Sequence, residues 1–335
     1  MLDWLHDAFL EPSTAGQKIF IMIVAIALFI LVVSVILFLV DLPKVPNWLL
    51  VTGFLGPVLI VLGWGLVRPA IITIYQSFRE YSSVGVDVGG AGLDNYTFFF
   101  TGTGNIQMLV NTLLWVLFVP VFSVVFGLVY AALVDRTRFE SAAKALIFLP
   151  TAISMVAASI AWKYVYYNPA PIGKPQVGLL NALLSLVGVP AQNWLIKFPT
   201  GTMALIAVMI WIQAGFAMTI LSAALKAVPD DIIEAARIDG ATGPRLFFSV
   251  MVPSIRPTLV VVFSTVAITS LKAFDIVNVM GGNLPANNVI ANAFRQQQVN
   301  FAYGKAGALA VLIFIAVMPV IIYNIVQMRK SEAIR

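Results

Sequence analysis

The sequence predicts an all-α integral membrane protein with about seven transmembrane helices. Two features of the composition indicate this class: 60% of the 335 residues are hydrophobic, and only 10% are charged. A soluble globular protein carries about 25% charged residues, because its core needs a polar surface. The third observation is a set of seven apolar stretches that reach the length of roughly 18 residues needed to cross the hydrocarbon layer as a helix.

The seven crossings are expected to be helices, because unpaired backbone groups cannot be hydrated in lipid. We expect them at about residues 19–40, 49–75, 108–134, 145–163, 203–225, 257–279 and 306–328. The first crossing does not resemble a cleavable signal peptide, since its flank MLDWLHDAFLEP is acidic and its apolar run is too long.

The basic side chains favour one orientation of these crossings. The segments outside the membrane must lie on alternate sides, which divides them into two sets. One set contains eleven Lys and Arg residues and the other contains six. Because the richer set normally stays in the cytoplasm, we expect the amino terminus outside and the carboxyl terminus inside. The richer set is Lys44, Arg136, Arg138, Lys144, Lys226, Arg237, Arg245, Arg256, Arg329, Lys330 and Arg335. The other set is Lys18, Arg79, Lys174, Lys197, Arg295 and Lys305.

Three segments assigned to the outside are rich in Gly, Pro and Asn. They cover residues 89–105, 168–200 and 281–304. This composition is typical of loops, and we expect short surface helices within them.

One segment assigned to the cytoplasm, PDDIIEAARIDGATGPRLFFSVMVP at residues 229–253, is charged and well punctuated. Asp231 and Glu234 have the spacing of a capping box, with Asp231 as the cap. We expect a helix from about Ile232 to Asp239, closed by Gly240 in a left-handed conformation. A second short helix can begin near Thr242, with a proline in its first turn.

This segment can be interpreted as a solvated loop or as a docking surface. A run of charges is usually only a solvated surface. Here Ala235, Ala236 and Gly240 leave little side-chain bulk, and charges of both signs surround them. That combination favours a surface on which another protein approaches the backbone closely.

The same residues resemble the membrane subunits of binding-protein-dependent ATP-binding-cassette (ABC) importers. The family signature is Glu-Ala-Ala, three residues, Gly, nine residues, then two hydrophobic residues spaced by one, and Pro. It is met here by Glu234-Ala235-Ala236, Gly240, Val250, Val252 and Pro253. The stretches ALKAVPDDIIEAARIDGA, GLDNY, NTLLW and YGKAGALAV resemble the maltose and α-glucoside branch. GGNLPANN departs from the Gly-Gly-Pro common there, which leaves the solute and the binding-protein contacts open.

The resemblance covers residues 49–335 and implies a six-helix type I importer core, with residues 1–48 as a tail and one extra helix. It implies that residues 231–241 are a coupling helix that docks on an ATPase subunit. The docking residues would be Glu234, Ala235, Ala236, Asp239, Gly240 and Ala241.

The resemblance also implies a function, a location and partners. The function would be ATP-driven import of a di- or oligosaccharide such as an α-glucoside, with glycerol phosphate and other polar solutes as alternatives. The location would be the bacterial cytoplasmic (inner) membrane. The partners would be a second permease subunit in a heterodimer, two ABC ATPases, an extracytoplasmic binding protein and membrane lipid.

The sequence contains no Gly-x-x-x-x-Gly-Lys-Ser/Thr phosphate loop. We therefore expect no enzymatic activity and no cofactor in this chain, with ATP and Mg bound by the partner ATPase. Cysteine is absent and the one histidine, His6, lies in the amino-terminal tail, so no metal or catalytic site is expected. No charged tail suggests nucleic acid as a partner.

Two crossings carry the aromatic and hydrogen-bonding side chains that a sugar-sized solute needs. The candidates are Trp211, Gln213, Phe216, Thr219, Ser270, Lys272, Phe274, Asp275 and Asn278. The same residue types also pack helix against helix in membranes, so each has this alternative role. Lys272 and Asp275 are spaced to pair along one helix face. Arg68 and Lys163 are either functional or long enough to reach the interface.

Two other functional classes fit the sequence less well. An ion-coupled secondary transporter needs acidic groups near the membrane midplane, and Asp275 is the one clear candidate in this sequence. A membrane-embedded enzyme needs paired aspartates, His-Glu-x-x-His or a Ser-His pair, and the sequence offers none of these.

Overall fold

The computed structural model describes residues 14–40, 46–135, 137–168, 178–281 and 284–332, which are helical apart from loops and one two-stranded sheet. This confirms the all-α membrane class. His6, Lys44, Arg136, Lys174 and Arg335 lie outside the described residues. The chain forms two compact units, Met1–Ile72 and Thr73–Arg335. The boundary at residue 48 marks where the resemblance to the family begins, whereas the two compact units are divided by their internal contacts. The boundary at residue 48 therefore stays a prediction.

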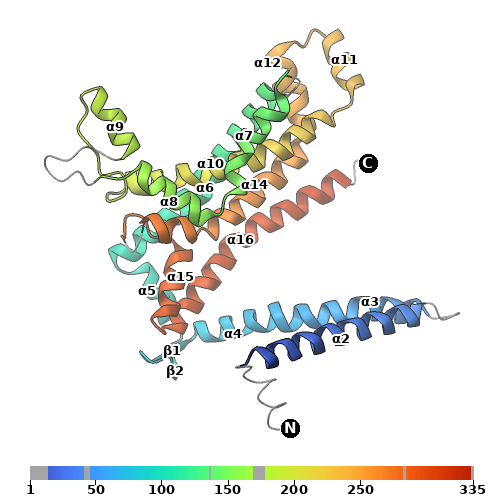
Figure 1. The fold of residues 1–335 in the computed structure, drawn as a ribbon, viewed down its shortest axis with the longest axis vertical. Helices are drawn as coiled ribbons and strands as arrows, with labels where there is room; N and C mark the ends of the chain where they lie inside the picture. The colour runs from blue at the N-terminus through green and yellow to red at the C-terminus, as the bar shows by residue number, and fades with distance from the viewer. Residues whose placement is uncertain (1–13, 41–45, 136, 169–177, 282–283, 333–335) are drawn as a thin grey trace. The chain divides into compact units, whose positions relative to one another are not determined.

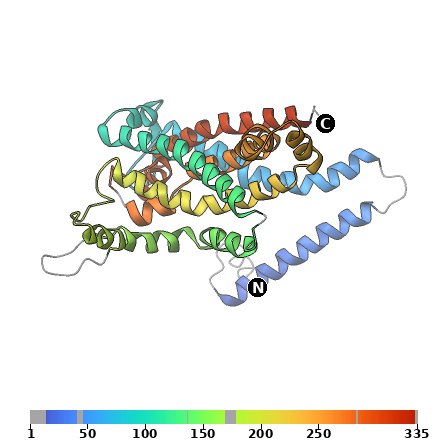
Figure 2. The same cartoon turned by 90° about the horizontal axis from the view of Figure 1, so that it is seen from above.

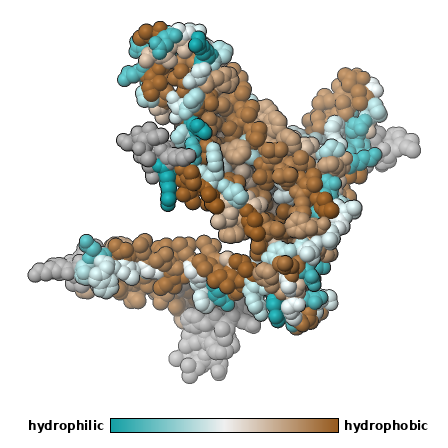
Figure 3. All heavy atoms as spheres, turned by 180° about the vertical axis from the view of Figure 1, so that it is seen from behind, coloured by the Kyte–Doolittle hydropathy of each residue, from teal (hydrophilic) through white to brown (hydrophobic). Residues whose placement is uncertain are grey.

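The first unit contains helices that are apolar on every side. They are α2 (Ala15–Val40) and α3 (Asn47–Leu62), followed by the π-helical η1 (Gly63–Val67) and the start of α4 (Arg68–Ser77). Large apolar side chains such as Phe29 and Ile60 are exposed on them, and Figure 3 shows their surface as mostly hydrophobic. A helix that is apolar all round is suited to lipid or to a protein core. The first two predicted crossings are therefore confirmed as helices.

The second unit begins with a β-hairpin that the sequence analysis did not predict. Strand β1 (Arg79–Tyr81) pairs antiparallel with β2 (Asp87–Gly90), and Gly85 turns the chain between them at φ +80°. The Arg79 Nε atom lies 2.9 Å from Asp87 Oδ2. This hydrogen bond holds the pKa of Asp87 below its ordinary value. The hairpin is short and depends on one glycine turn, so no periodic pattern marks it in the sequence.

The rest of the second unit is helical (Figure 1). Three short helices, α5 (Asp94–Phe100), α9 (Leu179–Leu186) and α15 (Ile290–Val299), lie in the segments where surface helices were expected. The other elements are α6 (Thr103–Val134), α7 (Glu140–Ala152), α8 (Met155–Val165), α10 (Thr200–Lys226), α11 (Asp230–Ile238), α12 (Gly243–Leu246), η2 (Phe247–Met251), α13 (Val252–Ser254), α14 (Arg256–Leu271), η3 (Val277–Gly281) and α16 (Tyr303–Glu332).

Helix α10 is the centre of the second unit and packs against α6, α7 and α14, with α6 alongside it in Figure 2. Two glycines permit the close approach. A Cβ added to Gly127 of α6 would lie 2.6 Å from the Cβ of Ala217, and one added to Gly215 would lie 2.5 Å from the carbonyl oxygen of Ile147. Small residues at helix contacts are the usual means of tight packing in membranes.

The predicted crossing 145–163 is broken, and a second bend lies just before the predicted crossing 257–279. Helices α7 and α8 are bent by 98° at Ile153 and Ser154, and the α12–α13 segment is bent by 73° from α14. Five of the described helices are long and apolar enough to cross a membrane, or up to seven elements if each bent pair is one crossing. Seven predicted crossings therefore agree with the structure when each bent pair is taken as one.

The end of the sixth predicted crossing, 257–279, is wrong. Helix α14 ends at Leu271, where the amide of Lys272 bonds to Thr269 and that of Ala273 to Ser270. Helical backbone resumes at Asp275. The predicted pairing of Lys272 with Asp275 on one helix face is therefore also wrong, because the helix is interrupted between them. Within the described residues the two side chains form no ion pair.

The glycine contact between α6 and α10 predicts opposite effects of two identical substitutions. Gly127→Ala places a methyl group against Ala217 and the Met218 backbone, and such overpacking costs about 1–3 kcal/mol. Gly56→Ala in α3 meets nothing within 4 Å, so it adds helix propensity worth up to about 1 kcal/mol. Thermal unfolding in detergent should show a lower midpoint for Gly127→Ala and an equal or higher midpoint for Gly56→Ala. Equal midpoints for Gly127→Ala and the unmodified chain would contradict the packing role.

Candidate functional site

Helix α11 lies at one end of the second unit (Figure 1), and its amino-terminal cap differs from the prediction. Pro229 is the cap residue, and its side chain makes no capping hydrogen bond. Asp230 and Asp231 both lie in that first turn, where a negative charge stabilises the positive end of the helix. The capping box with Asp231 as cap is therefore wrong, because the helix begins two residues earlier, at Asp230.

The carboxyl end of α11 has the predicted geometry. Gly240 has φ +83°, a conformation that costs a residue with a Cβ atom roughly 1–2 kcal/mol. The amide of Ala241 donates to the Ala236 oxygen at 2.9 Å, and that of Gly240 donates to Arg237 at 3.0 Å. These two bonds form a Schellman motif. Thr242 caps the next helix, α12, which continues through η2 and α13 instead of ending as a short helix.

One face of α11 is fixed and the other is open. Ile233 and Ala241 are buried, and Ala236 packs against the same core. Glu234, Ala235, Asp239 and Gly240 are exposed. An open hollow of about 490 Å³ is lined by Asp230, Ile233, Glu234, Arg237 and Ile238.

Ile238 is 81% exposed and was not among the predicted docking residues. It lies at the end of α11 among charged residues, and Ile232 is also exposed on this helix. Exposed apolar side chains with charged neighbours are typical of the surface that a protein partner covers. The signal in the sequence was three isoleucines on a short charged helix, of which Ile233 alone is buried.

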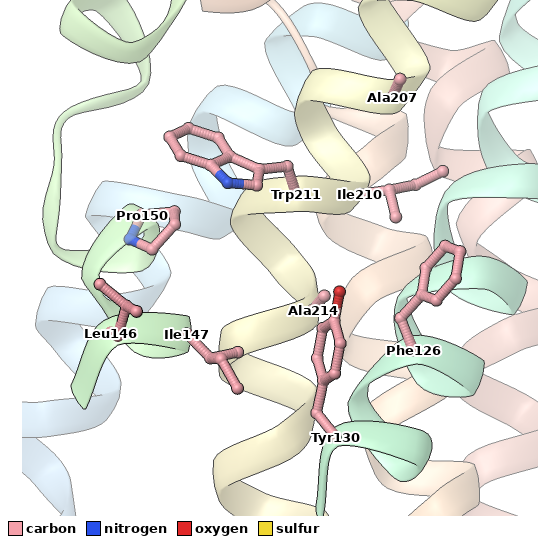
Figure 4. A pocket seen from close by; sticks show the side chains of 9 residues that line it. All are labelled: Phe126, Tyr130, Leu146, Ile147, Pro150, Ala207, Ile210, Trp211 and Ala214. Carbon is pink, nitrogen blue, oxygen red and sulfur yellow. The ribbon is translucent and has the colours of Figure 1, made fainter. Parts of the chain in front are cut away.

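A cavity of about 410 Å³ lies beside the broken α7–α8 pair (Figure 4). Its wall is aromatic and aliphatic, with the Tyr130 hydroxyl group as a polar member. The Thr151 hydroxyl group donates to the Ile212 carbonyl oxygen at 2.8 Å and holds α7 against α10 at this level. The lining residues are Phe126, Tyr130, Leu146, Ile147, Pro150, Ala207, Ile210, Trp211 and Ala214.

Aromatic rings continue from this cavity in two directions. On α6 the rings of Phe118, Phe122, Phe126 and Tyr130 stack one turn apart, with centroids 5.8, 6.1 and 6.3 Å from one to the next. On the other side Trp211 meets the edge of Trp162 at 5.6 Å.

The structure separates the nine predicted pathway residues. Trp211 lines the cavity beside α7, whereas Gln213 is buried and Phe216 packs against the core. The Thr219 hydroxyl group donates to Gly215 on its own helix, and that of Ser270 donates to Ala267.

The remaining four lie near the interruption after α14. Lys272 and Phe274 line a second cavity of about 420 Å³, with Phe294 and Arg295 of α15. Asp275 is partly buried and Asn278 is exposed. The nine residues therefore do not line a single chamber in this structure.

Arg68 and Lys163, the two basic residues noted within or beside the crossings, each contact another group. The guanidinium carbon of Arg68 lies 4.8 Å from the centre of the Trp64 ring, a cation–π contact within the first unit. The Lys163 ammonium group donates to the Val279 carbonyl oxygen at 3.3 Å and joins α8 to η3.

Comparisons with known proteins identify the family. Residues 105–330 match the family described as "Binding-protein-dependent transport system inner membrane component". The osmoprotective compounds uptake permease protein GgtC of Synechocystis is 43% identical over 284 residues, 84% of this chain and 100% of that protein. The alpha-glucoside transport system permease protein AglF of Rhizobium meliloti is 41% identical over 275 residues, 81% of this chain and 80% of that protein.

A solved structure shows the same fold. It is a bacterial ABC transporter involved in the import of the acidic polysaccharide alginate, with a TM-score of 0.69 and 20% identity over 85% of this chain and 96% of that chain. The family match, the two relatives and this fold agree with the spans and with the Glu-Ala-Ala signature. The chain belongs to the inner-membrane permease components of binding-protein-dependent ABC transport systems.

Proposed function

We propose that the chain is the permease subunit of an ATP-driven importer for a sugar, a di- or oligosaccharide of the α-glucoside type. The observation that carries the solute class is the 41% identity to the alpha-glucoside permease AglF over 81% of this chain. The trehalose/maltose permease MalF of Thermococcus litoralis, 29% identical over 198 residues, supports the same class. A second candidate is uptake of osmoprotective compounds, which the 43% identity to GgtC over its full length favours.

The proposal includes the partners and the orientation. A second permease, two ABC ATPases and an extracytoplasmic binding protein would complete the importer. ATP and Mg would be bound by the ATPases, because this sequence has no phosphate loop. The distribution of Lys and Arg places the amino terminus outside and the carboxyl terminus in the cytoplasm, which puts α11 on the side where the ATPases hydrolyse ATP.

Helix α11 would act as the coupling helix, residues 231–241. Its buried side, Ile233 and Ala241, joins it to the helical core, while Glu234 and Ile238 project outward. A surface that binds α11 can therefore move the core without separate contacts to it. Glycerol phosphate and other polar solutes remain alternatives for the cargo, since α11 does not contact the solute.

The cavity beside α7 and α8 would form part of the solute pathway. Ring faces pack against the C–H faces of a sugar, while the hydroxyl group of Tyr130 can bond to a sugar hydroxyl. The break after Ala152 follows closely on Pro150, which lines this cavity, and irregular backbone at membrane depth is tolerated where protein covers it.

The energy source separates this proposal from an ion-coupled transporter. We expect uptake of labelled maltose or trehalose by cells expressing the complete system to stop when ATP is depleted. We expect it to continue when an ionophore dissipates the ion gradients while ATP is maintained. Uptake that stops with the ionophore and survives ATP depletion would contradict the proposal.

The docking role of α11 predicts a loss of ATPase binding on Ile238→Asp. The side chain is 81% exposed, so the substitution should not unfold the chain, but it places a charge in the apolar part of the contact. A central contact residue contributes about 2 kcal/mol or more, so copurification of the ATPase should fall by about tenfold or more.

Leu186→Asp is the matched control, because Leu186 of α9 is also 81% exposed and lies away from α11. It should leave the ratio of ATPase to permease unchanged. If Ile238→Asp retains a full complement of ATPase, α11 is not the docking site at that residue. Binding of the ATPase would then no longer support the placement of α11 on the cytoplasmic side.

The aromatic cavity predicts weaker solute handling on Trp211→Leu. Losing the indole face removes a stacking surface of the cavity, so we expect the half-saturating sugar concentration for uptake to rise by about fivefold or more, corresponding to about 1 kcal/mol. Trp48→Leu, at an exposed tryptophan of α3, is the control. Equal kinetics for Trp211→Leu and the unmodified chain, at equal amounts of assembled complex, would remove this cavity from the pathway.

A further inference from the structure

Three helix ends meet in one ionic network in the second unit. Asp135 follows the last residue of α6, and Glu140 and Lys144 lie in the first two turns of α7. Ser222 and Lys226 lie in the last two turns of α10. The family signature and the solute cavity include none of these five residues.

The contacts form a continuous chain of alternating charges. The Lys144 ammonium nitrogen lies 2.5 Å from Asp135 Oδ1 and 2.8 Å from Glu140 Oε1. The Lys226 ammonium group donates to the same Glu140 oxygen.

The Ser222 hydroxyl group is the second link, after Lys226, between α10 and these charged groups. It donates to Asp135 Oδ1 at 2.7 Å and accepts a hydrogen bond from Lys144. Two carboxylates, two ammonium groups and one hydroxyl group therefore join α6, α7 and α10.

Three of these four charges are partly withdrawn from solvent, and Lys226 is exposed. The side chains of Asp135, Lys144 and Glu140 are 12%, 23% and 24% exposed, and that of Lys226 is 46% exposed. Pairs at the surface contribute little, but removal of one partner from a desolvated network leaves a charge without compensation. The position of the three helix ends is therefore held by the complete network.

The α10 part of the network, Ser222 and Lys226, lies between the solute cavity and α11 in the sequence. Lys226 is the last residue of α10, and α11 begins at Asp230 after a short connection in which Val228 is buried. In the other direction α6, α7 and α10 supply the whole lining of the 410 Å³ cavity. The end of α10 that carries Lys226 is therefore one route by which a displacement of α11 reaches the cavity.

We propose that Asp135, Glu140, Lys144 and Lys226 form a clasp that passes displacement of α11 to the helices around the solute cavity. The clasp makes the ends of α6, α7 and α10 move together. Without it, α11 moves the end of α10 alone and the cavity wall formed by α7 is left behind. This inference rests on the proposed coupling role of α11. The four residues are positioning residues, since they contact neither the solute nor the nucleotide.

The test is a charge exchange in the complete importer, reconstituted in liposomes with its second permease, ATPases and binding protein. Glu140→Lys and Lys226→Glu each place like charges together, whereas the double variant restores opposite charges at positions 140 and 226 and leaves like charges at positions 140 and 144. The measured quantity is ATP hydrolysed per maltose transported. We expect each single variant to raise this ratio by about fivefold or more, the low end of coupling effects between sites, and the double variant to recover part of it, because the pair between α7 and α10 is restored.

Two further measurements show whether the effect is on coupling. Copurification of the ATPase and the sugar concentration at half-maximal uptake should be unchanged in all three variants, because docking and the cavity are intact. Glu80→Gln, at an exposed carboxylate of β1, is the control for loss of a charge and should match the unmodified chain. Lys226→Met, at the most exposed member of the clasp, gives a milder change if a reversed charge prevents assembly.

The clasp is overturned if the single variants keep the normal ratio of ATP to maltose. It is also overturned if the double variant is no better than the single ones, or if transport falls only in step with the amount of assembled complex. Failure of the underlying function gives a different result. In that case the unmodified chain itself retains no ATPase, or hydrolysis in the unmodified complex does not depend on the binding protein and maltose.

Discussion

The close approach of α6 and α7 to α10 is the constraint on which the rest of the second unit depends. In lipid no hydrophobic effect draws helices together, so contact area and hydrogen bonds must do so. Gly127 and Gly215 remove the side chains that would keep the backbones apart. The Thr151 bond to the carbonyl oxygen of Ile212 fixes the height of α7 on α10. The cavity and the ionic network lie between these same three helices, so both depend on the same contacts.

The break between α7 and α8 is explained by residues on its two sides. Pro150 removes one backbone donor near the end of α7, and Ser154 supplies a new cap by accepting a bond from Ala157 at 3.1 Å. The chain can therefore turn by 98° while fewer backbone groups are left unpaired in lipid. The turn places Trp162 of α8 against Trp211 of α10, which shapes one side of the aromatic region. A straight crossing at this position would have carried α8 away from that contact.

The sequence predicted those features that depend on neighbouring residues. Apolar length was sufficient for the long helices, and Gly240 was sufficient for the left-handed end of α11, because few other residues adopt φ +83°. Predictions were wrong where several neighbouring residues could have played the same local role. Either of two adjacent aspartates could have capped α11, and Pro229 did so instead. Apolar residues such as Phe274 and Ile276 continue past Leu271 among the charged ones, so composition did not show that α14 ends there.

Features decided by distant partners were also beyond the sequence. Which face of α11 is buried depends on the core that Ile233 reaches, and this left the exposure of Ile238 unpredicted. The nine candidate pathway residues were chosen by chemical type, whereas the cavity beside α7 is selected by which helix faces meet. Trp211 satisfied both conditions. Tyr130 and Phe126 have the same chemistry and were missed, because they lie on a third helix whose register against α10 is set by Gly127.

The chemistry of the ionic network suits a joint better than apolar packing would. Replacement of a buried ion pair by apolar residues is often neutral or stabilising, so stability alone does not explain charges at these three helix ends. Apolar contacts are also undirected, and helices held by them can slide on one another. Lys144 instead binds Asp135, Glu140 and Ser222 at once. One ammonium group thus sets the relative position of three helices, and a displaced helix end can exchange one oxygen partner for another. A bistable element requires such discrete alternatives rather than continuous deformation.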